Sequence, residues 1–158
     1  MSTLQIPQGA LLINAFKPQV NTAAIEGDYI SCKTAHKVWV IFHMAQGHAA
    51  QAVLSLYEAT DVDGTSADAV AATFPIWYNL DCATDQFTRA AADAATYTLD
   101  VELKTKLVIF QIDPSILSAD HDCMKAYVAA SNILNIIGCQ YLIENRYKEV
   151  APPVVITD

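Results

Sequence analysis

Short segments in which side chains alternate between two faces recur along most of this chain. One of them, residues 37–43, is rich in β-branched and aromatic residues and is apolar on both faces. Such a segment is typical of a central strand that is covered on both sides. Comparable segments follow about every ten residues, separated by turn-forming residues, as in an all-β sandwich or barrel. The alternation therefore predicts a mainly β fold.

The expected strands, besides residues 37–43, cover residues 11–16, 29–33, 51–58, 70–78, 106–112, 123–130 and 138–147. A turn is expected at Asp63-Gly64, because Gly accepts the positive φ of such turns. Pro75 cannot donate to a sheet ladder, so residues 70–78 are expected at a sheet edge or a bulge. Asp113 is expected to cap a short helical turn whose first residue is Pro114.

Two segments do not alternate clearly. The alanine-rich residues 84–95 could form a short helix, and residues 131–137 could form a loop or a helical turn. We therefore expect a single-domain antiparallel β-sandwich, jelly-roll-like, over residues 1–150, with one or two short helical turns. Residues 151–158 are expected to form an extended C-terminal arm. Pro152 and Pro153 favour that conformation, and the arm could lie along a neighbouring subunit.

The composition is unusually apolar. Hydrophobic residues make up 53% of the 158 residues and charged residues only 16%, against about 25% charged in an average globular chain. A chain of this length can bury roughly 70% of its unfolded surface, so its core needs no metal or disulfide. The surplus apolar surface predicts a subunit interface.

The charge of the chain excludes several partners. The net charge of −8 leaves no positive cluster for a phosphate backbone or an acidic membrane surface. The first residues lack the Lys or Arg that precedes the apolar stretch of a secretory signal. The longest apolar runs are far shorter than the roughly 20 residues of a membrane span. We expect a soluble protein that binds neither nucleic acid nor membrane.

The cysteines are expected to be reduced thiols. Their positions give no C-x-x-C pair, and Cys139 lies in an alternating segment as a small buried residue. A Cys₂His₂ zinc site is conceivable on paper from Cys32, His36, His121 and Cys123. Zinc ligands usually come in tight pairs on one turn, and these two pairs are far apart in the sequence.

Other catalytic and ligand-binding patterns are also incomplete. Asp61, Asp63 and Gly64 match the start of a calcium loop, but the later acidic ligands are missing, and a hairpin turn explains them. A solvated acidic loop likewise explains Asp113 with its acidic neighbours. There is no G-x-S-x-G, no H-E-x-x-H and no Gly-rich phosphate loop. We expect no enzyme activity, no cofactor and no metal.

The aromatic residues offer a binding hypothesis. Trp39, Tyr57, Trp77 and Tyr78 could form a platform on which a sugar stacks. On strands, such residues more often belong to a core or to a subunit interface, and we favour that interpretation.

The order of these segments resembles that of the capsid decoration, or cement, proteins of tailed bacteriophages. The resemblance covers most of the chain from about Tyr29 onward. It rests on residues 36–43, 59–65, 76–79, 107–114, 130–132 and 145–147, and on the proline-led tail that ends in Ile156-Thr157-Asp158.

The resemblance implies a non-enzymatic virion protein that assembles in the host cytoplasm and binds the capsid surface. Its partner would be the major capsid protein, and it would be a homo-oligomer, with a trimer favoured. The expected interface comprises Trp77, Tyr78, Arg146, Tyr147, Pro152, Pro153, Val154, Val155 and Ile156. Two alternatives remain open: a head–tail or tail adaptor of the virion, and a carbohydrate-binding module.

Overall fold

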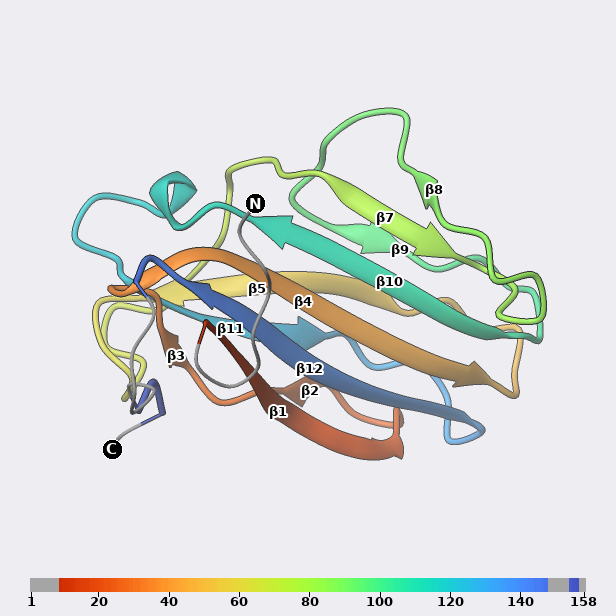
Figure 1. Ribbon diagram of the computed structural model, residues 1–158. Helices are drawn as coiled ribbons and strands as arrows, with labels where there is room; N and C mark the ends of the chain where they lie inside the picture. Colours follow the sequence, from red (N-terminus) through yellow and green to blue (C-terminus); the bar gives the residue numbers. More distant parts are fainter. Residues whose placement is uncertain (1–8, 148–153, 157–158) are drawn as a thin grey trace.

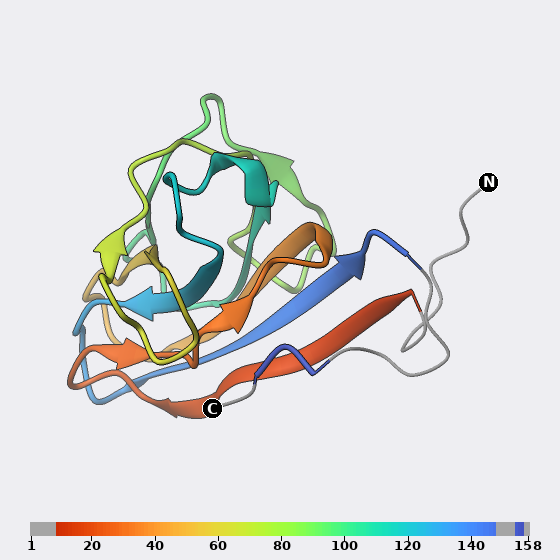
Figure 2. The same cartoon turned by 90° about the vertical axis from the view of Figure 1, so that its left-hand side faces the viewer.

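The computed structural model describes residues 9–147 and 154–156. Two antiparallel sheets pack face to face, and Figure 2 shows the two layers. Sheet A has the order β1 (Ala10–Val20), β12 (Asn135–Asn145), β4 (Ala35–Gln46), β10 (Thr105–Ile112), β7 (Ile76–Asn79) and β8 (Thr88–Arg89). It is the layer nearer the viewer in Figure 1. The expected antiparallel β-sandwich is confirmed.

Sheet B lies behind sheet A in Figure 1. Its main order is β2 (Ile25–Glu26), β11 (Cys123–Val128), β5 (Val53–Ala59) and β6 (Asp68–Ala69); β3 (Ile30–Ser31) also pairs with β11, and β9 (Tyr97–Thr98) with β5. Within the described residues, no helix has the length and hydropathy needed to cross a membrane.

The core lies between the sheets and is rich in aromatic rings. Phe110 contacts Phe42 and Phe74, with ring centroids 5.1 and 5.0 Å apart. Tyr141 of sheet A is fully buried, accepts a 2.7 Å hydrogen bond from the Ala126 amide of sheet B and donates to the Asp28 carbonyl at 3.2 Å. Burial raises its pKa well above the ordinary value. This hydroxyl therefore joins the two layers through the core.

Several local expectations are confirmed. Gly64 has a φ of 82° in the turn where the Thr60 amide donates to the Thr65 carbonyl. Asp113 caps the 3₁₀ turn Pro114–Ile116, and its side chain accepts from the Ser115 amide at 3.0 Å.

Other expectations are wrong. Residues 84–95 form no helix, because the Ala90 amide bonds to the Ile76 carbonyl and Ala94 bridges Phe74. These sheet contacts outweigh the helix propensity of alanine. The strand expected over 70–78 is restricted to β7, and the edge of the sheet is β8 instead. Residues 37–43 do form a central strand of sheet A, but only one of its faces is covered.

Candidate functional site

The expected interface residues do not form one surface. Trp77 lies on the outer face of sheet A, whereas Tyr78 points inward and stacks on Tyr97 at 5.4 Å. Arg146 and Tyr147 directly follow the C-terminal end of β12. Arg146 donates to the Ala35 carbonyl at 3.1 Å, and Tyr147 is 78% exposed. Pro152 and Pro153 lie outside the described residues, as does the expected domain boundary.

The described part of the tail returns to its own domain. Val155 is 5% exposed and belongs to the core cluster, and its carbonyl accepts from the Ser31 amide at 3.0 Å. Ile156 packs against the same core, while Val154 is 70% exposed. Val155 is thus buried in its own chain, and the expected contact of the tail with a neighbouring subunit stays a prediction.

The proposed sugar platform is not assembled. Trp39 and Trp77 share the outer face of sheet A, on strands separated by β10. Tyr57 lies on sheet B, tilted against Tyr127 with centroids 5.1 Å apart. With Tyr78 turned inward, the four aromatic side chains cannot contact one ligand.

The hypothetical zinc ligands have other surroundings. Both ring nitrogens of His121 contact backbone carbonyls, at 3.0 Å from Ser66 and 3.1 Å from Ala119. Cys32, Cys82, Cys123 and Cys139 are free thiols. Burial raises the pKa of Cys32 and of Cys123 to about 12. Among residues 9–147 and 154–156, no three His, Cys, Asp or Glu side chains gather closely enough to hold a metal ion.

An apolar surface occupies one end of the sandwich, where β10 and β12 begin and β1 and β4 end (Figure 1). Eleven large apolar side chains are exposed among the described residues, and six of them lie here. We call these six the apical patch: Val20 (47% exposed), Val101 (47%), Leu103 (61%), Ile133 (60%), Leu134 (58%) and Ile136 (44%). Large apolar side chains that gather exposed at one end of a domain are a candidate interaction site.

The register of sheet A brings the patch residues together. Val20 pairs with Ile136 across β1 and β12, and the neighbouring Asn135 pairs with Gln46 at the end of β4. The Gln46 amide donates to the Lys104 carbonyl at 3.1 Å, next to Leu103. Loop residues 131–134 and 99–104 therefore flank the same strand end.

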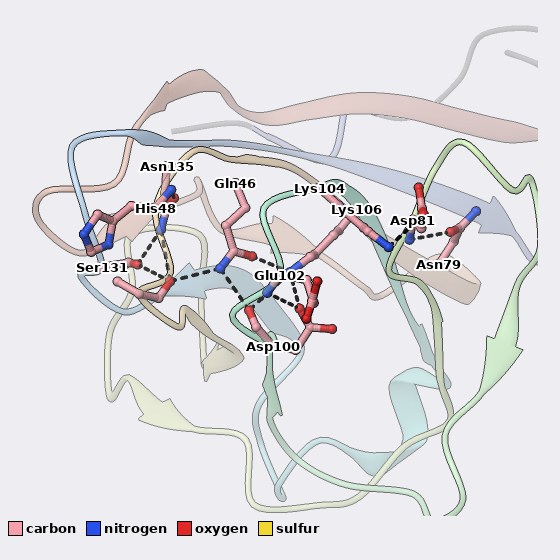
Figure 3. A network of polar contacts seen from close by, with 11 residues as sticks. Gln46, His48, Asn79, Asp81, Asp100, Glu102, Lys104, Lys106, Ser131 and Asn135 are labelled. Atoms are coloured by element: carbon pink, nitrogen blue, oxygen red, sulfur yellow. Dashed lines mark hydrogen bonds and ion pairs between the residues drawn. The ribbon is translucent and has the colours of Figure 1, made fainter.

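A buried polar network lies beneath the patch, and Figure 3 shows its members. Its centre is Lys106, whose side chain is 0% exposed. The Lys106 ammonium forms an ion pair with the Asp100 carboxylate and donates to Gln46 Oε1 at 2.5 Å. Gln46 Nε2 in turn donates to the carbonyls of Asp100 at 2.9 Å and Ala50 at 3.3 Å. Loop 99–104 is thus fastened to the ends of β4 and β10.

Asn135 fastens the other loop. Its Oδ1 accepts from the His48 amide at 2.9 Å, and its Nδ2 donates to the Ala50 carbonyl at 3.0 Å and to Ser131 Oγ at 2.9 Å. A buried network with all members paired holds one geometry, because any rearrangement leaves polar groups unsatisfied. The loops that carry the apical patch are therefore held to the strand ends by these hydrogen bonds.

An exposed ion pair extends the network. Lys104 Nζ lies 2.9 Å from the Asp81 carboxylate, and the Asp81 amide donates to Asn79 Oδ1 at 3.0 Å. The hydrogen bond from Lys104 lowers the pKa of Asp81, and the same contact raises the pKa of Lys104. This pair links loop 99–104 to the end of β7.

Sequence reasoning did not find this surface. One signal was present, since Lys106 alternates with the inward-facing Val108 and Phe110 and so falls on the buried face. Its partner Gln46 is 60 positions away in the sequence. The exposure of Leu103 and Leu134 depends on irregular loops, which have no periodic pattern.

No family model matches the chain, and neither does any curated protein. Among solved structures, it is similar to the SPBc2 prophage-derived protein YomS, with 8% identity, a TM-score of 0.49, and coverage of 90% of this chain and 98% of that one. It is also similar to the N-terminal cellulose-binding domain of Cellulomonas fimi β-1,4-glucanase C, with 10% identity, 90% and 80% coverage and a TM-score of 0.35. The coat protein of Tobacco streak virus gives 7% identity, 96% coverage of both chains and a TM-score of 0.27.

Proposed function

We propose that this chain is a non-enzymatic structural protein of a tailed-phage virion that decorates and stabilises the assembled capsid. The proposed partner is the major capsid protein, and the proposed location is the capsid surface. The family resemblance of the sequence supports this assignment. The observation that carries it in the structure is the apical patch, an exposed apolar surface on pre-fixed loops.

The proposed mechanism is burial of the apical patch against the capsid lattice. Apolar burial contributes about 25 cal/mol per Å², from which the costs of association are subtracted. Ordering of loops at an interface is one of those costs. The contacts of Lys106 and Asn135 fix the two loops in the free protein, which lowers that cost. The net charge of −8, directed to solvent, would keep decorated particles apart.

Variants of the patch test this mechanism by co-sedimentation with expanded capsids of the phage that encodes the chain. Leu103→Asp and Leu134→Asp each place a charge in the proposed interface, so we expect at least a tenfold loss of affinity. Phe87→Asp is the matched control, because Phe87 is also exposed, at 42%, but lies outside the patch. Equal binding by all three variants would contradict docking through the apical patch.

The same experiment separates the assignment from the adaptor alternative. A decoration protein should saturate at a fixed ratio to capsid subunits. Binding of only about a dozen copies per particle would favour a head–tail or tail adaptor, which assembles as a ring.

A further inference from the structure

The charged residues that the register places on the outer face of sheet A, Lys37 and Glu144, have opposite sign and lie opposite each other on β4 and β12. The side chains of this face come from alternate residues of five neighbouring strands, as the burial pattern and the register place them. We define the outer face as Leu12, Asn14, Lys37, Trp39, Ile41, His43, Trp77, Leu107, Ile109, Gln111, Gly138, Gln140, Leu142 and Glu144. These positions carry one basic and one acidic residue and therefore no net charge with His43 neutral, although the chain as a whole has nine basic and 17 acidic residues.

A hollow lies in the middle of this face. It has a volume of about 270 Å³, and its lining includes Ile41, His43, Leu107, Gly138 and Gln140. At Gly138 the missing side chain lets Pro18, which also lines the hollow, pack against β12, because a Cβ there would lie 3.1 Å from the Pro18 ring. The volume suits one large apolar side chain.

Trp77 lies on the same face as the hollow. It pairs with Ile109 of β10, which pairs with Ile41 of β4 at the margin of the hollow. The indole is 36% exposed even though it belongs to a strand with neighbours on both sides. One face thus carries both a hollow and an exposed indole.

We propose that the outer face of sheet A binds a second copy of this chain, with the Trp77 indole of each copy in the hollow of the other. Because indole and hollow lie on one face, mutual insertion requires a two-fold axis and gives a dimer. An axis that runs along the strands between β4 and β10 would place Trp77 of one copy above the hollow of its partner (Figure 1).

Charge favours a second copy as the occupant. Two chains that each carry −8 repel one another over most of their surfaces. The outer face bears one carboxylate at the positions defined above, Glu144, and Lys37 lies opposite it on β4, so two copies can approach there with little like-charge repulsion. Strongly acidic or strongly basic partners would find no net complementary charge at these positions.

The area is sufficient for a specific contact. Five strands at about 4.8 Å spacing and seven residues of β4 at about 3.4 Å give roughly 550 Å² per copy. Two copies then bury about 1,000 Å² or slightly more, which is at the lower end for specific interfaces. Stacked sheets in sandwiches already pack in this way, about 10 Å apart. The outer face borders the apical patch, since Ile136 precedes Gly138 on the same side of β12, but the inference does not depend on capsid docking.

Sedimentation equilibrium of the purified full chain tests the proposal. We expect a dimer whose dissociation constant rises at least tenfold in Trp77→Ala, which removes the indole, and in His43→Trp, which fills the hollow. Phe87→Ala is the matched control, because it removes an aromatic ring of similar exposure outside the face. Urea unfolding should give the same midpoint for each variant and the parent, since both positions are on the surface.

Mixing the two variants gives the sharper result. The Trp77→Ala chain keeps an intact hollow and the His43→Trp chain keeps its Trp77, so a mixed dimer retains one of its two insertions. We expect the equimolar mixture to dimerise more tightly than either variant alone. A monomeric or trimeric parent chain, an equal effect of Phe87→Ala, or no gain on mixing would overturn the proposal.

Discussion

Replacing Asp100 by Asn removes the carboxylate that neutralises Lys106. The Glu102 amide donates to Asp100 Oδ1 at 2.9 Å, and the side-chain oxygen of Asn can still accept this hydrogen bond. Removing one partner of a buried ion pair costs about 3–5 kcal/mol, because the other charge stays buried. The Asp100 side chain is 37% exposed, so solvent already screens part of the pair. We therefore expect a loss of about 2–3 kcal/mol in the free energy of unfolding. For a chain of this size, Tm should fall by about 6–9 °C.

Urea unfolding followed by tryptophan fluorescence measures this loss. Lys106→Met removes the charge itself and leaves Gln46 Oε1 without its donor, so it should cost less, about 1–2 kcal/mol. Lys104→Met is the control two residues away, since the Lys104–Asp81 pair is exposed and should contribute less than about 1 kcal/mol. A cost below about 0.5 kcal/mol for Asp100→Asn, or a larger cost for Lys106→Met, would refute the reasoning.

The tail, a histidine and the thiols give further expectations. Val155→Asp should lower the free energy of unfolding by about 2–4 kcal/mol because Val155 is buried, whereas the exposed Val154→Asp should change it by less than about 0.5 kcal/mol in the same urea experiment. Hydrogen bonds to the carbonyls of Ser66 and Ala119 raise the pKa of His121. The stability that the His121 imidazolium contributes to the fold is therefore fully present below the unfolded pKa of about 6.5, and it is lost as pH rises through the higher folded pKa. Hydrogen exchange of loops 60–66 and 117–122, corrected for intrinsic rates, should therefore be slower at pH 6 than at pH 8.5, and equal protection at both would contradict this. Iodoacetamide on the folded protein should label Cys82 first, since the other three thiols are buried; simultaneous labelling of all four, read by mass spectrometry, would contradict the burial.

The strands could be predicted where side chains alternate. The strand expected at 106–112 is β10, and the one expected at 37–43 lies within β4. The wrong detail was the covering of both faces of residues 37–43. Trp39 and Ile41 are half-buried on an open face, so part of the surplus apolar surface is the outer face itself. Composition alone does not say whether such surface lies in a core or at an interface.

The site could not be predicted in the same way, because long-range contacts create it. The partners of Lys106 come from β4 and from loop 99–104, and nothing in local periodicity joins them. The burial of Val155 could not be predicted for a similar reason. Val155 follows two prolines that favour extended chain, yet its burial depends on the distant Ser31. A tail segment can be extended and still be buried against the domain to which it belongs.

Co-sedimentation of the purified chain with expanded and unexpanded capsids tests the proposed decoration role most directly. Copies bound per capsid subunit would be measured over a range of protein concentrations. The account predicts saturation at a fixed lattice ratio on expanded capsids and weaker or absent binding on unexpanded shells. Absence of saturable binding to expanded capsids would contradict it.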